Sequence, residues 1–142
     1  MKHEHSRKFN LPFTWAEPPF HVVLVEPQIP PNTGNIARLC AATGSRLHLI
    51  RPMGFRISNA KLKRAGLDYW DSIEPQIHAN FDDFMKNVRP SRCFLFSTAG
   101  QCSYLSAHYQ PGDAFVFGSE TKGLSNALLS KFQIVRHDNL DV

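Results

Sequence analysis

The stretch "HVVLVEPQIPPNTGNIARLC" (residues 21–40) passes from an apolar run through a proline-rich turn into a helical pattern. Residues 21–26, HVVLVE, form a continuous run of the kind that is buried on both faces of a parallel sheet. Asn32 is placed to cap the helix, and Gly44 is placed to end it. Three apolar residues share one face of this helix: Ile36, Leu39 and Cys40. The stretch therefore predicts a strand, a stiff loop and a helix in succession.

The rest of the chain repeats this alternation of strands and helices. Further strands are predicted at residues 47–51, 72–78, 93–98, 114–118 and 133–137, the second of them weak and interrupted by Pro75. Further helices are predicted at residues 58–66, 80–88 and 125–131, the first two capped by Ser58 and Asn80. Such alternation builds right-handed βαβ units, so we expect an α/β fold with a mostly parallel sheet and helices on both faces.

The bulk composition fits one domain. A chain of 142 residues can bury a core without disulfides or metal. Residues 1–20 are polar, then dotted with proline and aromatic residues, and are expected to be a poorly ordered extension or to drape over the surface. Residues 21–142 are expected to be the folded domain. The formal net charge of +4 suits an anionic partner but equally fits an ordinary solvated surface.

The three cysteines are odd in number and lack CxxC spacing, which favours reduced thiols. No stretch approaches the roughly 20 apolar residues of a membrane span, and the first twenty residues lack the apolar core of a signal peptide. We therefore expect a cytoplasmic protein that does not contact a membrane. No metal site is predicted, because His3 and His5 are best explained as a solvated terminal pair.

Three loops follow predicted strand ends and should open at the same edge of the sheet: residues 27–35, 99–106 and 118–125. The first loop places Asn32 and Asn35 at a helix N-terminus, with Arg38 about one turn further along. Free N–H groups and the helix dipole at such a terminus favour an anion, so the loop is a candidate phosphate site. The alternative is a well-capped helix with a solvated arginine.

The loop "FGSETKG" (residues 117–123) places Gly118 and Gly123 on either side of Glu120. Glycine permits close approach of the backbone to a ligand. The loop lacks both the GxGxxG order of a dinucleotide site and the GKS or GKT of a P-loop, so nicotinamide and ATP sites are poorly supported. A backbone-lined pocket with one carboxylate is predicted, and an ordinary strand-to-helix turn is the alternative.

The segment "KLKRAGLDYW" (residues 61–70) combines cations with aromatic residues. Lys61, Lys63 and Arg64 could bind phosphates while Tyr69 and Trp70 stack on bases. A charged helix face over core aromatics explains the same residues. The chain has no HExxH, no GxSxG and no paired-carboxylate spacing, so nothing specific supports a hydrolase.

Together, "VLVEPQIPPNTGNIARLCAATGSRLHLIRPMGF", "LKRAGLDY" and "FVFGSETKGLS" closely resemble the SPOUT superfamily of RNA ribose methyltransferases. Within it, they resemble the small YibK-like enzymes that 2'-O-methylate the wobble cytidine or uridine of leucine tRNAs. The resemblance implies an α/β-knot fold, S-adenosylmethionine as methyl donor without a metal, a homodimer, and the tRNA anticodon loop as the target.

The resemblance also assigns site residues. Asn32, Asn35 and Arg38 match the first family motif, whose arginine is the catalytic candidate. Four further residues match positions at the methyl-donor pocket: Phe96, Gly118, Glu120 and Gly123. Because a guanidinium stays protonated at ordinary pH, Arg38 is a poor general base. We therefore expect Arg38 to bind the adjacent phosphate and to stabilise the developing alkoxide, while water or phosphate takes the proton.

The family continues past its second motif with a strand, a third motif of the form S-x-N-L-S and a long closing helix. Here residues 131–142 read KFQIVRHDNLDV, in which QIVRH matches the strand but the third motif and helix are not seen. The knot-forming part is thus expected to be incomplete and donor binding weak or absent. The rival function is a non-catalytic module for tRNA binding or dimerisation, and a third reading is an unstable fragment without function.

Overall fold

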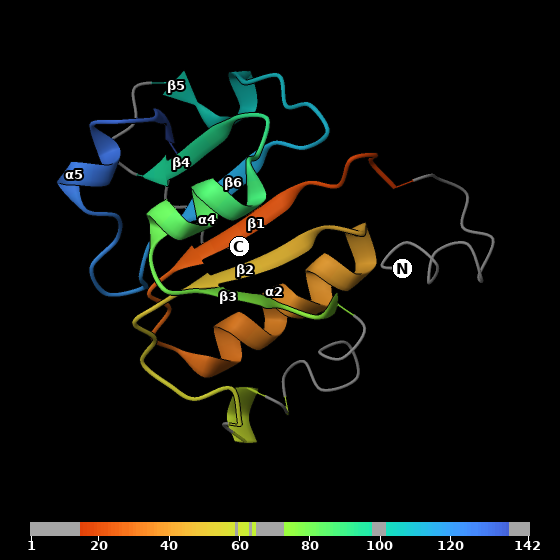
Figure 1. Cartoon of the computed structure of the whole chain (residues 1–142), viewed down its shortest axis with the longest axis vertical. Coiled ribbons are helices and arrows are strands. Elements are labelled where there is room, and N and C mark those ends of the chain that lie inside the picture. The colour runs from red at the N-terminus through yellow and green to blue at the C-terminus, as the bar shows by residue number, and fades with distance from the viewer. Residues whose placement is uncertain (1–14, 59, 63, 65–72, 98–101, 137–142) are drawn as a thin grey trace.

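The protein is an α/β domain built on one parallel sheet (Figure 1). The computed structural model describes residues 15–58, 60–62, 64, 73–97 and 102–136. The sheet has seven strands in the order β3-β2-β1-β6-β4-β7-β5. All neighbouring strands in it pair in parallel. The predicted fold class is confirmed, while the knot stays a prediction.

The strands are β1 (His21–Val25), β2 (Arg46–Ile50), β3 (Gln76–His78), β4 (Cys93–Ser97), β5 (Cys102–Ser103), β6 (Ala114–Phe117) and β7 (Gln133–Arg136). The described helices are α2 (Pro30–Thr43), α4 (Phe81–Val88), α5 (Asn126–Leu129) and the 3-10 turn η1 (Tyr104–Ser106). The strand β7 corresponds to the QIVRH match, and it pairs with β4.

The sheet separates two hydrophobic clusters. On one face, Phe84 of α4 packs with Val23, Leu95 and Val116, and α5 adds Leu128 and Leu129. On the other face, Ala37, Cys40 and Ala41 of α2 pack on Leu24, Leu47 and Leu49. Because side chains alternate along a strand, neighbouring residues of β1 serve opposite clusters. Helices therefore cover both faces, as the sequence predicts.

The start of α2 differs from the prediction. Asn32 is not the N-cap, because the helix already begins at Pro30 and Ile29 occupies the cap position without a side-chain hydrogen bond. Proline fits the first helical turn since its fixed φ suits the helix and no N–H is needed there. The loop is thus shorter than predicted, and the Asn-Thr-Gly-Asn cluster is helical.

The buried face of α2 also differs in one residue. Cys40 is buried, but Leu39 is 61% exposed, so the predicted apolar face is only partly correct. The helix instead turns small residues toward the sheet: Thr33, Gly34, Ala37, Cys40 and Ala41. Small side chains allow α2 to approach the strands closely.

Other predicted helix ends are confirmed. Gly44 ends α2 in the left-handed conformation, with φ of 71°. The side chain of Asn80 accepts a hydrogen bond from the Asp83 amide at the start of α4, at 2.8 Å. Strand β3 is shorter than predicted, because it begins only after Pro75. The predicted helix at 58–66 is described only in part.

The residues before β1 pack against the domain. Phe20 stacks on Phe115, with ring centroids 5.2 Å apart, and the Phe20 carbonyl accepts a hydrogen bond from the Arg46 amide. Trp15 lies so close to Gly44 that a Cβ there would collide with the indole. Residues 1–14 of the predicted extension lie outside the described residues. In the part of the chain that the structure describes, no helix has the length and apolar character that crossing a bilayer demands.

Candidate functional site

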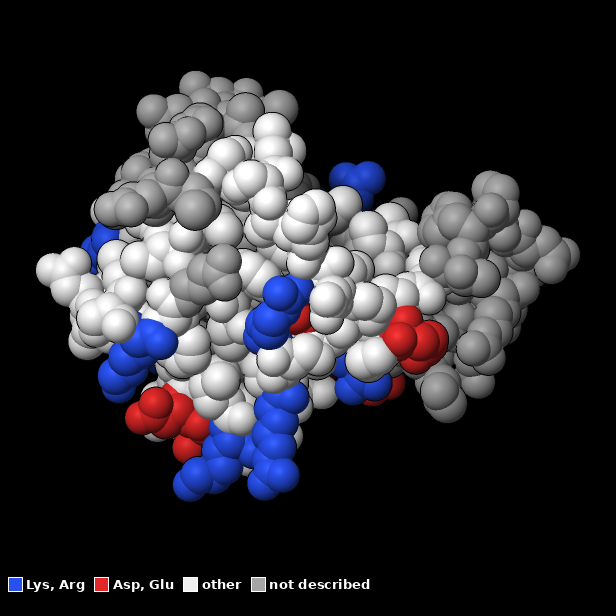
Figure 2. Space-filling model, turned by 90° about the horizontal axis from the view of Figure 1, so that it is seen from above, with Lys and Arg blue, Asp and Glu red and all other residues white. Residues whose placement is uncertain are grey.

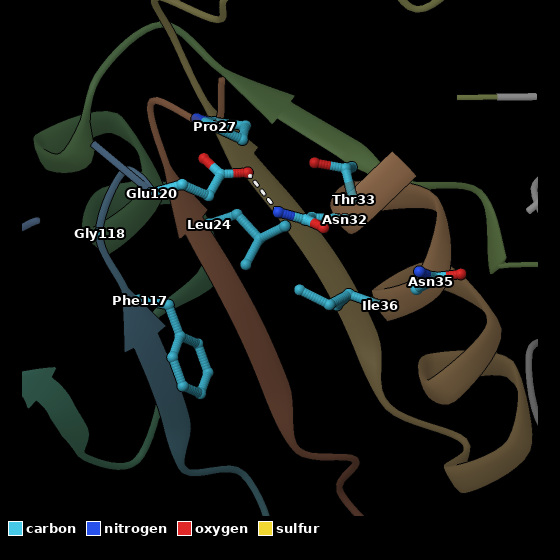
Figure 3. A pocket seen from close by; sticks show the side chains of 9 residues that line it. All are labelled: Leu24, Pro27, Asn32, Thr33, Asn35, Ile36, Phe117, Gly118 and Glu120. Atoms are coloured by element: carbon cyan, nitrogen blue, oxygen red, sulfur yellow. Dashed lines mark hydrogen bonds between the residues drawn. The ribbon is translucent and has the colours of Figure 1, made fainter. Parts of the chain in front are cut away.

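A pocket of about 370 Å³ opens between α2 and the carboxyl ends of β1 and β6 (Figure 3). Leu24, Ile36 and Phe117 form its apolar floor. Its polar rim consists of Asn32 and Asn35 from α2 with Glu120 from the loop after β6. The volume falls within the range of small-molecule sites, which combine an apolar lining with a few placed polar groups. The structure thus brings the first and third predicted loops together.

The carboxylate of Glu120 joins these two loops. It accepts hydrogen bonds from the backbone N–H of Gln28 at 2.8 Å and from that of Ile29 at 3.1 Å. The side-chain amide of Asn32 donates a further, longer bond to Glu120, at 3.5 Å (Figure 3). A negative charge in front of a helix N-terminus is also favoured by the helix dipole. Glu120, from the loop after β6, therefore caps the N-terminus of α2, which the apolar side chain of Ile29 cannot do.

This arrangement corrects the predicted phosphate site at the start of α2. Pro30 and Pro31 have no N–H to offer, and the amides of Asn32 and Thr33 donate to the Ile29 carbonyl. The two preceding amides are bonded to Glu120. A phosphate would find no free backbone N–H in this turn and would meet a carboxylate instead. The expected phosphate site was wrong because the carboxylate belongs to Glu120, which lies 91 positions after Ile29 and so cannot be seen in the local sequence.

We expect Glu120→Gln to lower the free energy of unfolding by about 1 kcal/mol, as the loss of a helix cap typically does. The amide side chain keeps one acceptor oxygen but turns an N–H₂ group toward two donors. Urea unfolding of Glu120→Gln beside Lys122→Gln, an exposed control in the same loop, measures the difference. Equal midpoints for the two variants would show that Glu120 does not hold the loops together.

Gly118 and Gly123 shape the loop after β6. A Cβ at Gly118 would collide with the backbone of Gly123 and Leu124, so only glycine fits this close approach. The Gly123 amide donates to the Ser119 carbonyl at 2.8 Å, and Gly123 adopts a φ of 66°. Gly118 lines the pocket, and its need for glycine comes from the backbone of Gly123 and Leu124 in the same loop. Gly123 is not among the lining residues.

Two predicted residues lie just outside this pocket. Phe96, near the end of β4, stacks on Phe117 at a centroid distance of 4.7 Å, so it packs against one residue of the pocket floor from the neighbouring strand. Arg38 is exposed on α2 one turn beyond Asn35 and does not line the pocket. A ligand bound in the pocket could meet Arg38 only through a part that extends outside it.

The predicted RNA-binding residues are placed in part. Lys61 and Arg64 are exposed on either side of the fully buried Leu62, whereas Lys63 lies outside the described residues. On the face shown in Figure 2, the Lys and Arg side chains of the described residues are interspersed with Asp and Glu side chains.

The described thiols are unsuited to nucleophilic chemistry. Burial raises the pKa of Cys40 to about 12 and that of Cys93 to about 11. Both therefore remain protonated at neutral pH, when only a thiolate is an effective nucleophile. Among the described residues, no group of three or more His, Cys, Asp or Glu side chains is arranged so that it could hold a metal ion.

Several lining residues were not singled out from the sequence. Leu24, Pro27, Thr33, Ile36 and Phe117 line the pocket although none was predicted as a site residue. Four of them lie within or directly beside the two predicted loops, and Leu24 lies in the strand that leads into the first loop, so proximity to the strand ends was the available signal.

Comparison with known proteins identifies the family. Residues 19–137 match the model of the SpoU rRNA Methylase family, which covers most of the chain. The chain belongs to this family. The match includes both loops of the pocket and extends through β7.

Individual members of the SpoU family give finer comparisons. A tRNA (cytidine(34)-2'-O)-methyltransferase of Burkholderia pseudomallei (strain 1106a) is 51% identical over 115 residues, which are 80% of this chain and 74% of that protein. A solved structure described as "Structural insights into the 2-OH methylation of C/U34 on tRNA" is 44% identical, with a TM-score of 0.80, over 84% of this chain and 79% of the other.

A more distant solved structure shares the fold alone. It is the SpoU methyltransferase AviRb from Streptomyces viridochromogenes in complex with the cofactor AdoMet, 20% identical with a TM-score of 0.71. It covers 86% of this chain and 52% of the other.

Proposed function

We propose that this protein transfers a methyl group from S-adenosylmethionine to the ribose 2'-OH of nucleotide 34, cytidine or uridine, in tRNA. The observation that carries the proposal is the pocket that joins α2 to the glycine loop after β6, in a chain that is 51% identical over 115 residues to a tRNA (cytidine(34)-2'-O)-methyltransferase. The finer parts of the proposal are leucine tRNAs as substrates, a homodimer as the working form and the cytoplasm as location.

The pocket suits the methyl donor in its chemistry. Leu24, Ile36 and Phe117 offer an apolar surface to the adenine, and Gly118 lines the pocket beside them. We infer that the side-chain amide of Asn32 hydrogen-bonds a ribose or methionine group, because it lies at the rim of the pocket, whereas the Asn35 side chain points away from Leu24 and Phe117 (Figure 3). Glu120 acts here by keeping α2 and the loop at a fixed separation. When bound, S-adenosylmethionine supplies an electrophilic methyl group on a positively charged sulfur.

Besides binding the methyl donor, the protein has to align the ribose oxygen with the methyl group and to stabilise the charge that develops on that oxygen. An in-line displacement needs the ribose oxygen and the methyl group to be held in near-attack geometry. Arg38, exposed on α2 beyond Asn35, is positioned to hold a phosphate of the tRNA outside the pocket. Its fork of N–H donors would then stabilise the charge that develops on the 2'-oxygen.

The test is a methylation assay with purified protein, tRNA and S-adenosylmethionine, followed by nuclease digestion and mass spectrometry. We expect one methyl group on the ribose of nucleotide 34, and none when that nucleotide carries a 2'-deoxyribose. A parallel calorimetric titration with S-adenosylhomocysteine measures donor-site binding directly. Binding of tRNA without methylation and without S-adenosylhomocysteine binding would favour the non-catalytic module instead.

A further inference from the structure

A second hollow, of about 580 Å³, lies in the loop that follows β2. Arg51 and Arg56 flank it, and Met53, Phe55 and Ile57 give it an apolar lining. Both arginines are exposed, whereas the three apolar side chains are half-buried. The hollow therefore offers two cations above an apolar and partly aromatic floor.

This hollow adjoins the candidate site. The Gly54 amide donates to the Pro27 carbonyl at 2.9 Å, and Pro27 itself lines the first pocket. A Cβ at Gly54 would lie 3.0 Å from the Cα of Gln28, so the two loops are in close backbone contact. The Gln28 amide is in turn bonded to Glu120. One continuous set of contacts thus joins the hollow, the turn after β1 and the rim of the pocket.

The segment that lines the hollow carries charge of one sign. Residues 51–64 contain five basic residues and no acidic residue. Among the described residues, no carboxylate is ion-paired with Arg51 or Arg56. By contrast, the exposed Arg92 is held by Asp113 at 2.7 Å. Arg51 and Arg56 are therefore available to an anion from outside the protein.

We propose that this hollow binds a nucleotide of the substrate RNA next to the methylated one, with Arg51 and Arg56 on its phosphate and Phe55 against its base. The inference rests on the proposed function and adds a substrate subsite to it. Arginine binds phosphate oxygens through paired N–H donors, and unpaired RNA bases stack on aromatic side chains. The subsite positions the target ribose at the first pocket from one side.

The experiment measures binding of a fluorescently labelled tRNA anticodon stem-loop by anisotropy over a series of salt concentrations. We expect Arg51→Ala/Arg56→Ala to raise Kd about tenfold and to flatten the salt dependence, because each lost phosphate contact removes about 0.7 from the log–log slope. The control is Lys86→Ala/Lys131→Ala, which removes the same charge from exposed positions on α4 and after α5. Its Kd should stay within about twofold of the wild type.

Two further variants separate the roles of the positive charge, the paired guanidinium N–H donors and the aromatic ring of Phe55. Arg51→Lys/Arg56→Lys keeps the charge, so the salt slope should be retained while affinity falls a few-fold with the loss of the paired donors. Phe55→Leu keeps the apolar volume but removes the stacking face, so affinity should fall a few-fold at an unchanged slope.

The outcomes distinguish this inference from the function on which it rests. An alanine pair that binds RNA as the control pair does, at every salt concentration, would overturn the subsite while leaving the proposed function intact. A wild-type protein that does not bind the stem-loop would overturn both. Equal urea midpoints for all variants show that the comparison is between folded proteins. If Arg51→Ala/Arg56→Ala does not fold, the affinity of Arg51→Lys/Arg56→Lys relative to the wild type tests the subsite instead.

Discussion

Arg38→Ala is expected to lower the rate of ribose methylation at least a hundredfold, about the loss that follows removal of one donor to a developing oxyanion. Arg38 is exposed on α2 beside the rim of the pocket, so its loss should leave the fold and the donor pocket intact. Turnover at saturating tRNA and donor, with S-adenosylhomocysteine binding measured in parallel, separates a loss of catalysis from a loss of binding.

The lysine variant sharpens this test. Arg38→Lys keeps a positive charge but presents no planar fork, so it should recover only part of the lost rate. Lys131→Ala, an exposed position after α5, serves as the matched control for loss of a cation. Nearly full turnover in Arg38→Lys would contradict the account in which paired N–H donors hold the phosphate and the developing charge.

The second large effect concerns three histidines that cross the sheet from β1 to β3. His21 Nδ1 lies 2.9 Å from His48 Nε2, and His48 Nδ1 lies 3.0 Å from His78 Nε2. His48 is fully buried and Phe84 packs edge-on against it. Each N–H···N bond needs one protonated and one bare ring nitrogen, so the chain is satisfied when all three rings are neutral.

Acid should therefore destabilise the protein. Burial, with a smaller contribution from Arg46, lowers the pKa of His21 to about 4, and burial lowers the pKa of His78 against the opposing effect of Asp83. Between pH 6.5 and about 4 the unfolded chain binds more protons than the folded one, so stability is full above this window and lost as pH falls through it. His21 alone predicts a loss of about 2 kcal/mol between about pH 7.5 and about pH 5.

Urea unfolding at the two pH values measures this loss. His21→Gln removes the ring at the end of the chain, so the variant should be less stable at neutral pH but should lose less on acidification. His108→Gln is the control, because His108 is exposed and lies outside the chain of rings. The histidine account would be refuted by a His21→Gln variant that loses as much stability on acidification as the wild type does.

Much of the fold could be predicted because its signals are local. The apolar runs of β1, β4 and β6, the cap at Asn80 and the terminal Gly44 depend on near neighbours in the chain. The parallel sheet with helices on both faces follows from the alternation of these elements. The start of α2 was misplaced because Asn32 and the tandem prolines carry conflicting local signals, and the prolines occupy the first turn.

The sequence by itself determined the fold class, the two loops of the pocket and the resemblance to a methyltransferase family, since each depends on residue types at short spacings. Only the tertiary structure decided which side chain caps the N-terminus of α2, why Gly118 must be glycine, and that three histidines form one hydrogen-bonded row. The bonds of Glu120 and the histidine row join residues that are far apart in sequence, whereas Gly118 meets Gly123 within one folded loop. The distant partners are chosen by strand order and register, which no local pattern specifies.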